Sequence, residues 1–286
     1  MADWLWINGR LQARSEAAIS PFDHGVLVGD GVFETLVARG GVPFAALEHW
    51  ERLVWSCEVM GLMPMSWEDF ERAIATVLDA NELAEARVRV TQTSGDGPLG
   101  SDRGTGRGTV LVTATKLGMW GPTERVLVAP WTRNENGALA GVKSVSYAEN
   151  VRALAYAKAR GCGEALLANT RGELCEGTGS NVFVVRQGRL TTPPLASGCL
   201  AGVTRLLVLR ACERAGIECG EEPMPMELLR ECEEAFLTSS TREVHPISEV
   251  DGRALETGPV TKAVAEAFAN LVRSRADGAP ARQSHP

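Results

Sequence analysis

Two turn dipeptides near the start of the chain limit how its first part can fold. Asn8-Gly9 lies inside WLWINGRLQ and Gly40-Gly41 lies inside GVFETLVARGGVPF, each between apolar runs. Such dipeptides favour the positive φ angles of tight antiparallel hairpins. The next segment, AALEHWERLVWSCEVMG, has helical spacing with a stop at Gly61, and a second helix is predicted to begin at Ser66, with Asp69 completing a capping pattern. Hairpins combined with helices indicate an α+β fold.

The remaining pattern divides the chain into two unequal parts. Alternating strands in ARVRVTQTSG and GTVLVTATKL flank a glycine-rich loop at 95–108, which either covers a site or is a plain surface loop. The segment GMWGPTE follows a strand and contains Gly and Pro, so we expect an interdomain linker at 118–124. The predicted organisation is a smaller domain at 1–117, a larger domain at 125–275 and a disordered tail at 276–286.

The larger domain is predicted to mix strands and helices. Its apolar runs are short and are separated by Gly and Pro, which is typical of such a mixture. The expected elements are a strand in RVLVAPW, a helix at about 148–160, a strand pair around Glu176 that includes the run Val182–Val185, a helix at about 204–215 ending at Gly216, a helix at about 225–232, a strand in EAFLTSS and a last helix from Pro259.

Composition excludes several classes of function. The chain has 286 residues, 44% hydrophobic and 23% charged, as in an ordinary globular protein. Its formal net charge of −7 argues against nucleic-acid binding, which requires a basic surface. No apolar run is long enough for a membrane span, and the start resembles no signal peptide. Seven cysteines without a CxxC pair indicate reduced thiols and a cytoplasmic protein, and no metal-site motif is present.

The stretch ELCEGTGSNVFVV places one carboxylate, Glu176, before five small or polar residues and a buried strand. One interpretation is a tight turn with a solvated acid. The other is that the backbone passes close to a ligand and that the carboxylate faces a cationic group. Cys175 beside it is either a reactive thiol or, as we expect, a buried packing residue.

Three further turns contain residues that suit an anion and an imine. Val203 and Thr204 fall where a helix begins, and the first amides of a helix bind anions, although Thr204 alone would read as a simple N-cap. Four hydroxyl residues, 238–241, end a strand and precede Arg242, where they bind phosphate or merely satisfy a turn. Lys143 precedes a helix. A lysine, a carboxylate and anion-binding turns are together what pyridoxal phosphate requires.

The order of these blocks resembles a known family. VKSVSYAEN, LCEGTGSNVFVV, TTPPLASGCLAGVTR and FLTSSTREVHPI are similar to successive blocks of the class IV pyridoxal-phosphate enzymes, and FDHGVLVGDGVFETL and HWERL extend the match over about 5–268. The family includes branched-chain and D-amino acid aminotransferases, (R)-selective amine transaminases and 4-amino-4-deoxychorismate lyases. The resemblance implies a two-domain fold of type IV, like that of D-amino acid aminotransferase, whose smaller domain covers the site.

The resemblance also implies roles for individual residues. Lys143 matches the Schiff-base lysine, and the other three lysines (116, 158 and 262) do not match the motif. Glu176 matches the carboxylate that pairs with the pyridine nitrogen, and Arg52 matches the phosphate-binding arginine. Tyr147 lies one residue earlier than the corresponding tyrosine of some relatives. The implied cofactor contacts are Arg52, Lys143, Tyr147, Glu176, Val203, Thr204, Ser240 and Thr241.

Substrate contacts are implied for Phe33, Glu34, Arg89 and Arg242. Phe33 and Glu34 could instead belong to a strand whose Phe points into the core. Arg89 matches an arginine of the branched-chain enzymes. The D-amino acid enzymes carry their arginine slightly later, where this chain has Gln92, Thr93 or Ser94. Arg242 could bind a substrate carboxylate or form a salt bridge to Glu243 or Glu249.

The implied reaction is transfer of an amino group between an amino acid or (R)-amine and a 2-keto acid. The alternative is the lyase, which releases 4-aminobenzoate and pyruvate with the same residues. A protein that binds pyridoxal phosphate without turnover is a remote third reading, because the full set of Lys, Glu, Arg and Thr is present. The family also implies a homodimer, since a loop of the neighbouring subunit completes its sites.

Overall fold

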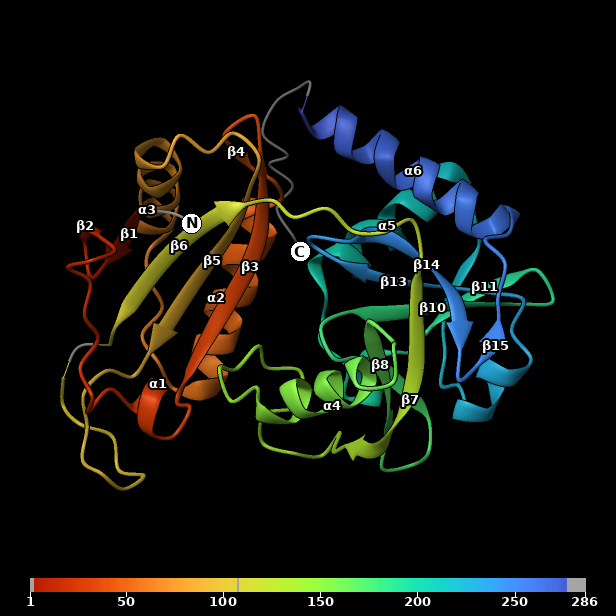
Figure 1. Ribbon diagram of the computed structural model, residues 1–286, viewed down its shortest axis with the longest axis horizontal. Helices are drawn as coiled ribbons and strands as arrows, with labels where there is room; N and C mark the ends of the chain where they lie inside the picture. Colours follow the sequence, from red (N-terminus) through yellow and green to blue (C-terminus); the bar gives the residue numbers. More distant parts are fainter. Residues whose placement is uncertain (1–2, 107, 277–286) are drawn as a thin grey trace. The chain divides into compact units, whose positions relative to one another are not determined.

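The computed structural model describes residues 3–106 and 108–276. Contacts divide the chain into two compact units (Figure 1). The first unit comprises Met1–Trp120 and Asn136–Arg152, and the second comprises Gly121–Glu135 and Ala153–Pro286. The division into domains at 1–117 and 125–275 stays a prediction. The predicted tail lies outside the described residues, except that Ala276 ends the last helix.

The first unit is built on a six-stranded sheet in which every pair of neighbours is antiparallel. Its strand order is β2-β1-β6-β5-β3-β4. The predicted hairpins at Asn8-Gly9 and Gly40-Gly41 are confirmed. The elements are β1 (Trp4–Ile7), β2 (Arg10–Ala13), α1 (His24–Leu27), β3 (Gly31–Arg39), β4 (Val42–Pro43), α2 (Ala46–Met60), α3 (Trp67–Ala80), β5 (Ala86–Thr93) and β6 (Val110–Lys116).

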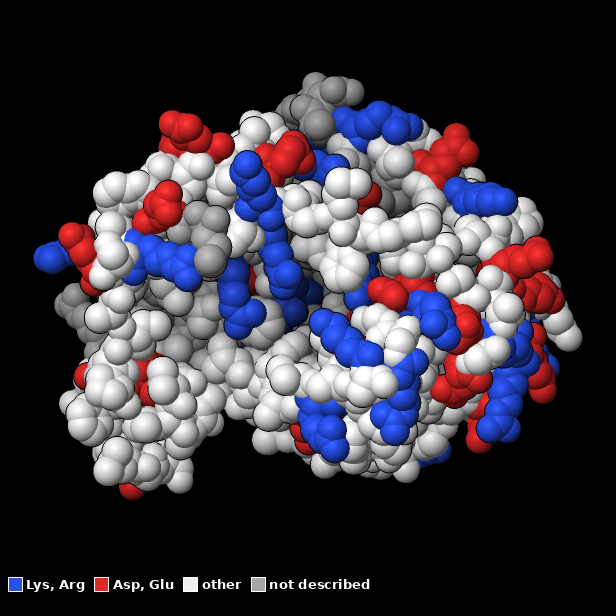
Figure 2. All heavy atoms as spheres, viewed as in Figure 1, with Lys and Arg blue, Asp and Glu red and all other residues white. Residues whose placement is uncertain are grey.

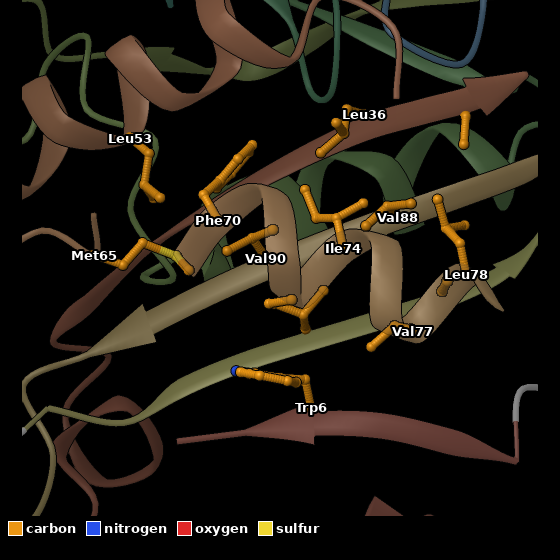
Figure 3. Close-up of a cluster of buried hydrophobic side chains, with 14 of the residues drawn as sticks. Trp6, Leu36, Leu53, Met65, Phe70, Ile74, Val77, Leu78, Val88 and Val90 are labelled. Carbon is orange, nitrogen blue, oxygen red and sulfur yellow. The ribbon is translucent and has the colours of Figure 1, made fainter. Parts of the chain in front are cut away.

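The core of the first unit lies between this sheet and the helices α2 and α3. Side chains alternate across a strand, so Leu36, Val88 and Val90 face the buried side chains of the helices, Phe70 among them (Figure 3). The predicted helix ends are confirmed: Gly61 follows α2 in the left-handed region, and the Ser66 hydroxyl accepts from an amide in the first turn of α3.

The second unit contains a nine-stranded mixed sheet in the order β12-β11-β10-β13-β14-β7-β8-β9, with β15 paired to β14. Helices α5 and α6 pack on each other and on β13. Its elements are β7 (Glu124–Arg133), β8 (Glu164–Asn169), β9 (Leu174–Gly177), β10 (Asn181–Arg186), β11 (Arg189–Thr192), η1 (Leu195–Ser197), α5 (Val203–Ala215), β12 (Cys219–Glu221), η2 (Met226–Arg230), β13 (Glu234–Ser239), β14 (Glu243–Val250), β15 (Arg253–Ala254) and α6 (Pro259–Ala276). Helix α4 (Ala148–Lys158) runs from the first unit into the second.

Two local expectations were wrong. The helix predicted at about 225–232 is the single 3-10 segment η2, which the preceding Pro225 starts. Thr204 is not an N-cap: the cap of α5 is Gly202, and Thr204 lies buried inside the first turn. The first error concerns the type of helix, and the second concerns a helix end, where several residues can satisfy the same backbone groups.

Within the described residues, no helix is both long and apolar enough to cross a membrane. Acidic and basic side chains are interspersed over elements of both units on the face shown in Figure 2. All seven cysteines are unpaired with each other, and six of them are buried.

Candidate functional site

The predicted site residues fall into two groups, one in each unit, and each group is held by contacts of its own unit. Lys143 is fixed by a short antiparallel pairing with the start of β3. The Phe33 amide donates to the Lys143 carbonyl at 2.9 Å, and the Val145 amide donates to the Gly31 carbonyl at 2.9 Å. This pairing brings the Lys143 Nζ to 4.5 Å from the centroid of the Phe33 ring.

The Phe33 ring contacts three of the predicted site residues. Besides Lys143, the Arg89 guanidinium carbon lies 3.7 Å from its centroid, and the Tyr147 ring meets it edge-on at 5.3 Å. Phe33 is 4% exposed but lies outside the core cluster under α2 and α3. Burial lowers the pKa of Arg89. The burial of Phe33 agrees with a core position, and its role in lining a substrate pocket stays a prediction.

Glu34 points to the opposite face of β3, toward α2. Its carboxylate accepts from the Arg52 Nε at 2.8 Å and from the Arg52 Nη2 at 2.7 Å, and it lies 2.7 Å from the His49 Nδ1. Burial acts to raise the pKa of Glu34, but the charge and hydrogen bonds of Arg52 and the His49 hydrogen bond outweigh it and lower the pKa to about 2. Burial also lowers the pKa of His49, despite its bond to Glu34.

Glu176 lies in strand β9 of the second unit and is 8% exposed. The reading of a solvated acid in a tight turn is therefore wrong. Its Oε2 accepts from the Leu200 amide at 2.9 Å, and its Oε1 lies 3.4 Å from the Nε of Arg133. Arg133 ends β7, far from Glu176 in sequence, and sequence reasoning missed it because no local pattern marked it.

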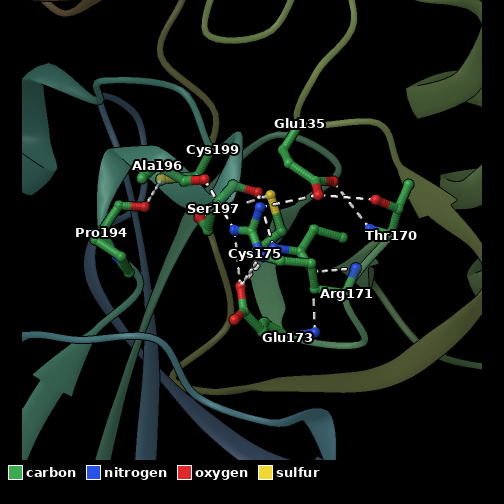
Figure 4. A network of polar contacts seen from close by, with 10 residues as sticks. Glu135, Thr170, Arg171, Glu173, Cys175, Pro194, Ala196, Ser197 and Cys199 are labelled. Atoms are coloured by element: carbon green, nitrogen blue, oxygen red, sulfur yellow. Dashed lines mark hydrogen bonds and ion pairs between the residues drawn. The ribbon is translucent and has the colours of Figure 1, made fainter.

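A network of polar contacts holds the loop that presents the Leu200 amide (Figure 4). Arg171 donates to a carbonyl of η1 at 3.0 Å, and Asn169 donates to another at 3.4 Å. Glu135 in turn accepts from Arg171 at 2.9 Å. Gly198 has φ +90°, and a Cβ there would lie 2.7 Å from the Glu135 side chain. This close approach and the positive φ require glycine at this position.

Cys175 beside Glu176 is fully buried. Burial raises the pKa of its thiol far above the usual value. A thiol of this kind stays protonated and is a poor nucleophile. The packing interpretation of Cys175 therefore agrees with the structure.

The start of α5 has the features of an anion site. Gly202 caps the helix without any side-chain hydrogen bond. A Cβ on Gly202 would collide with the Asn181 amide oxygen, so a larger residue there requires the Asn181 side chain to shift. Val203 and Thr204 are buried in the first turn, where the backbone amides have no partner inside the helix.

Ser240 and Thr241 lie in the turn that joins β13 to β14. Arg242 follows them and forms ion pairs with Glu164 at 3.0 Å and Glu124 at 3.7 Å. Arg242 thus forms salt bridges, as one of the two interpretations predicted, but its partners are carboxylates on β8 and β7 that could not be identified from the sequence. Glu249, which the sequence offered, pairs with an arginine of β7 at 2.8 Å.

This chain is similar to known proteins over most of its length. The family model described as amino-transferase class IV matches residues 31–250. The putative branched-chain-amino-acid aminotransferase of Methanocaldococcus jannaschii is 35% identical over 93% of this chain and 96% of its own length. The D-alanine aminotransferase of Bacillus licheniformis is 32% identical with the same coverage. A branched-chain aminotransferase structure from Thermoproteus uzoniensis, solved with norvaline, superposes with TM-score 0.90 at 30% identity and covers 96% of both chains.

Proposed function

Because this chain belongs to the class IV aminotransferases, we propose that it moves the amino group of an aliphatic 2-amino acid to a 2-keto acid, with pyridoxal phosphate bound through Lys143. The expected family, the type IV fold and the cofactor class are confirmed at family level. The roles of individual residues and the choice of substrate are our proposals.

One observation carries the choice of substrate. Lys143 and Arg89 both lie against the Phe33 ring, at 4.5 and 3.7 Å from its centroid. An amine that moves the α-proton and a guanidinium that binds a carboxylate are what an amino acid substrate needs near one another. The positions where D-amino acid enzymes carry their arginine have no cation here: Gln92 bonds the backbone of Met63, and Thr93 bonds Asp23.

The residues of both units fit pyridoxal phosphate. The start of α5, which no side chain caps, suits the phosphate, as does the hydroxyl turn at 240–241. At the end of β13, beside that turn, the Thr238 hydroxyl is buried and has no hydrogen-bond partner among the described residues. We assign Arg52 to the phosphate as well, and Glu176 to the pyridine nitrogen.

When bound, pyridoxal phosphate supplies an electron sink for the bond that is broken at the substrate α-carbon. Lys143 holds the cofactor and then transfers the proton. Arg133 and the Leu200 amide hold the Glu176 carboxylate in one orientation. We place the Tyr147 hydroxyl near the phenolic oxygen of the cofactor. We assign Arg89 to the substrate carboxylate, and Phe33 to the pocket wall.

The test is the absorption spectrum of the holoenzyme during addition of one amino donor at a time, without a keto acceptor. L-leucine is expected to convert the visible band of the lysine-bound cofactor into the ultraviolet band of its amino form. D-alanine and (R)-1-phenylethylamine are the comparison donors. Conversion by D-alanine alone would contradict the assignment of Arg89. If no donor converts the band and 4-amino-4-deoxychorismate yields 4-aminobenzoate and pyruvate, the lyase alternative replaces this proposal.

We also infer a cytoplasmic homodimer. An exposed apolar surface supports association: Phe22, Val26 and Val28 are 52%, 64% and 46% exposed, and Leu99 is 75% exposed. The segment of Leu99 joins this surface because the Gly97 amide donates to the Phe22 carbonyl at 3.1 Å. The unpaired, mostly buried cysteines agree with a reducing compartment. Light scattering of the purified protein tests the dimer, and a monomeric mass would exclude it.

A further inference from the structure

We propose that Glu34 is a positioning residue: together with His49, it fixes the Arg52 guanidinium in the orientation that binds the cofactor phosphate. This inference rests on the proposed function, because it takes Arg52 as a phosphate ligand. It assigns Glu34 to the phosphate end of the site, although sequence reasoning had placed it with the substrate.

The pleat of β3 separates Glu34 from the substrate side. Neighbouring residues of a strand point to opposite faces of the sheet. Phe33 lies on the face of Arg89 and Lys143, whereas Glu34 lies on the face of α2, with Leu36. Glu34 is 0% exposed, so its carboxylate reaches no solvent-filled pocket in this structure. Direct contact with a substrate bound against Phe33 would require Glu34 to leave its partners.

The contacts of Glu34 restrict Arg52 to one orientation. The two carboxylate oxygens accept from the Nε and the Nη2 of Arg52, which is the planar, two-pronged arrangement that fixes a guanidinium most strongly. The bond from His49 holds the same carboxylate from one helical turn earlier on α2. Glu34 engages two of the five N–H groups of Arg52, so this carboxylate fixes the plane of the guanidinium.

Stability alone does not account for this cluster. Replacing a buried ion pair by apolar side chains often leaves the free energy of unfolding unchanged or raises it. Removing only one partner lowers it, because the other charge stays buried without its partner. The measurable benefit of the pair is orientation: an arginine that is already held loses less side-chain entropy when it binds a phosphate. The Glu34 charge also offsets the Arg52 charge inside the unit, so the guanidinium can stay buried before the phosphate arrives.

The experiment compares pyridoxal phosphate with pyridoxal, which lacks the phosphate. Each is titrated into apoenzyme, and the visible band of the lysine-bound cofactor reports binding. The variants are Glu34→Gln, which keeps the size and removes the charge, Glu34→Asp, which keeps the charge and shortens the side chain, and His49→Leu. The matched control is Glu249→Gln, because Glu249 also binds an arginine through two hydrogen bonds, at 3.0 and 2.8 Å, but on the surface of the second unit.

We expect Glu34→Gln to weaken binding of pyridoxal phosphate by roughly tenfold or more, because hydrogen bonds between charged groups contribute most. Its affinity for pyridoxal stays at the wild-type value. His49→Leu weakens binding of pyridoxal phosphate by about threefold, because it removes one hydrogen bond to the Glu34 carboxylate and leaves both bonds between Glu34 and Arg52 in place. The affinity of Glu34→Asp for pyridoxal phosphate lies between those of Glu34→Gln and the wild type. Glu249→Gln changes neither affinity.

A purely structural role would lower both affinities together, so an unchanged ratio of the two affinities in Glu34→Gln and His49→Leu overturns the inference. If Glu34→Gln does not fold, as judged by circular dichroism, the ratios for Glu34→Asp and His49→Leu decide. Failure of the wild type to form the visible band with pyridoxal phosphate refutes the proposed function itself. If the wild type binds pyridoxal phosphate and the variants keep its ratio of affinities for pyridoxal phosphate and pyridoxal, only the role of Glu34 is refuted.

Discussion

The carboxylate of Glu164 is predicted to hold together two segments assigned to the cofactor. It accepts from the Ala165 amide at 3.1 Å, the Thr178 amide at 3.0 Å, the Ser180 hydroxyl at 3.1 Å and the Arg242 Nη1 at 3.0 Å. The Thr178 hydroxyl donates to it as well. Glu164 is 2% exposed. One buried side chain therefore ties the segment after Glu176 to the turn of Ser240 and Thr241.

Glu164→Gln is the informative perturbation, because glutamine keeps the size and loses the charge. Its amide nitrogen cannot accept a hydrogen bond, so either the bonds from the Ala165 and Thr178 amides to one oxygen or the bond from Arg242 to the other must break. Removing one partner of a buried ion pair costs about 3–5 kcal/mol. We expect the free energy of unfolding to fall by this amount and the affinity for pyridoxal phosphate to fall with it.

Urea denaturation of apoenzyme, followed by circular dichroism, measures the first quantity, and titration with pyridoxal phosphate measures the second. Glu249→Gln is the control, because it breaks a glutamate–arginine ion pair at the surface, and we expect a much smaller change there. A loss below about 1 kcal/mol in Glu164→Gln, the level of an exposed pair, would refute the reasoning.

Three more outcomes are expected. Lys143→Ala abolishes the borohydride-reducible adduct with pyridoxal phosphate, whereas Lys158→Ala retains it. Mass spectrometry detects the adduct, and its presence in Lys143→Ala would contradict the assignment of Lys143 as the lysine that binds the cofactor. The pKa of Glu34 falls from 4.5 to about 2 on folding, so its contribution is full above pH 4.5 and is lost as the pH drops toward 2. The free energy of unfolding of wild type should therefore exceed that of Glu34→Gln by about 3 kcal/mol at pH 5, as calculated from this pKa shift, and the difference should shrink toward pH 3. Urea titrations measure it, and a difference that stays constant would contradict the pKa shift. Gly202→Ala forces a methyl group onto Asn181 and should weaken binding of pyridoxal phosphate in the same titration; an unchanged affinity would contradict the assignment of the phosphate to the start of α5.

Features that depend on neighbouring residues could be predicted from the sequence. The hairpin at Asn8-Gly9 and the cap at Ser66 follow from local turn chemistry, so the structure confirms them. The start of α5 was misassigned because Gly202 and Thr204 are both acceptable near a helix start, and only the tight approach of Asn181 selects the glycine.

Partners that are distant in the sequence could not be predicted. Arg133 reaches Glu176 only because β7 and β8 pair in parallel and β9 pairs with β8. Arg242 likewise binds Glu164 through the order of strands in the second sheet. A residue match to a family indicates which side chains belong to a site. The sheet topology then determines which of them touch each other.

The pleat of β3 limits how the substrate specificity of this enzyme can evolve. Residues 33 and 34 are adjacent in the chain, but their side chains occupy opposite faces. If Phe33 forms the pocket wall, as proposed, a change in its size is expected to alter the preferred substrate without disturbing the contacts of Glu34. A one-residue insertion in β3 would exchange the two faces and damage both at once. New specificities are therefore expected to arise in this strand by substitution, and its length is expected to stay fixed.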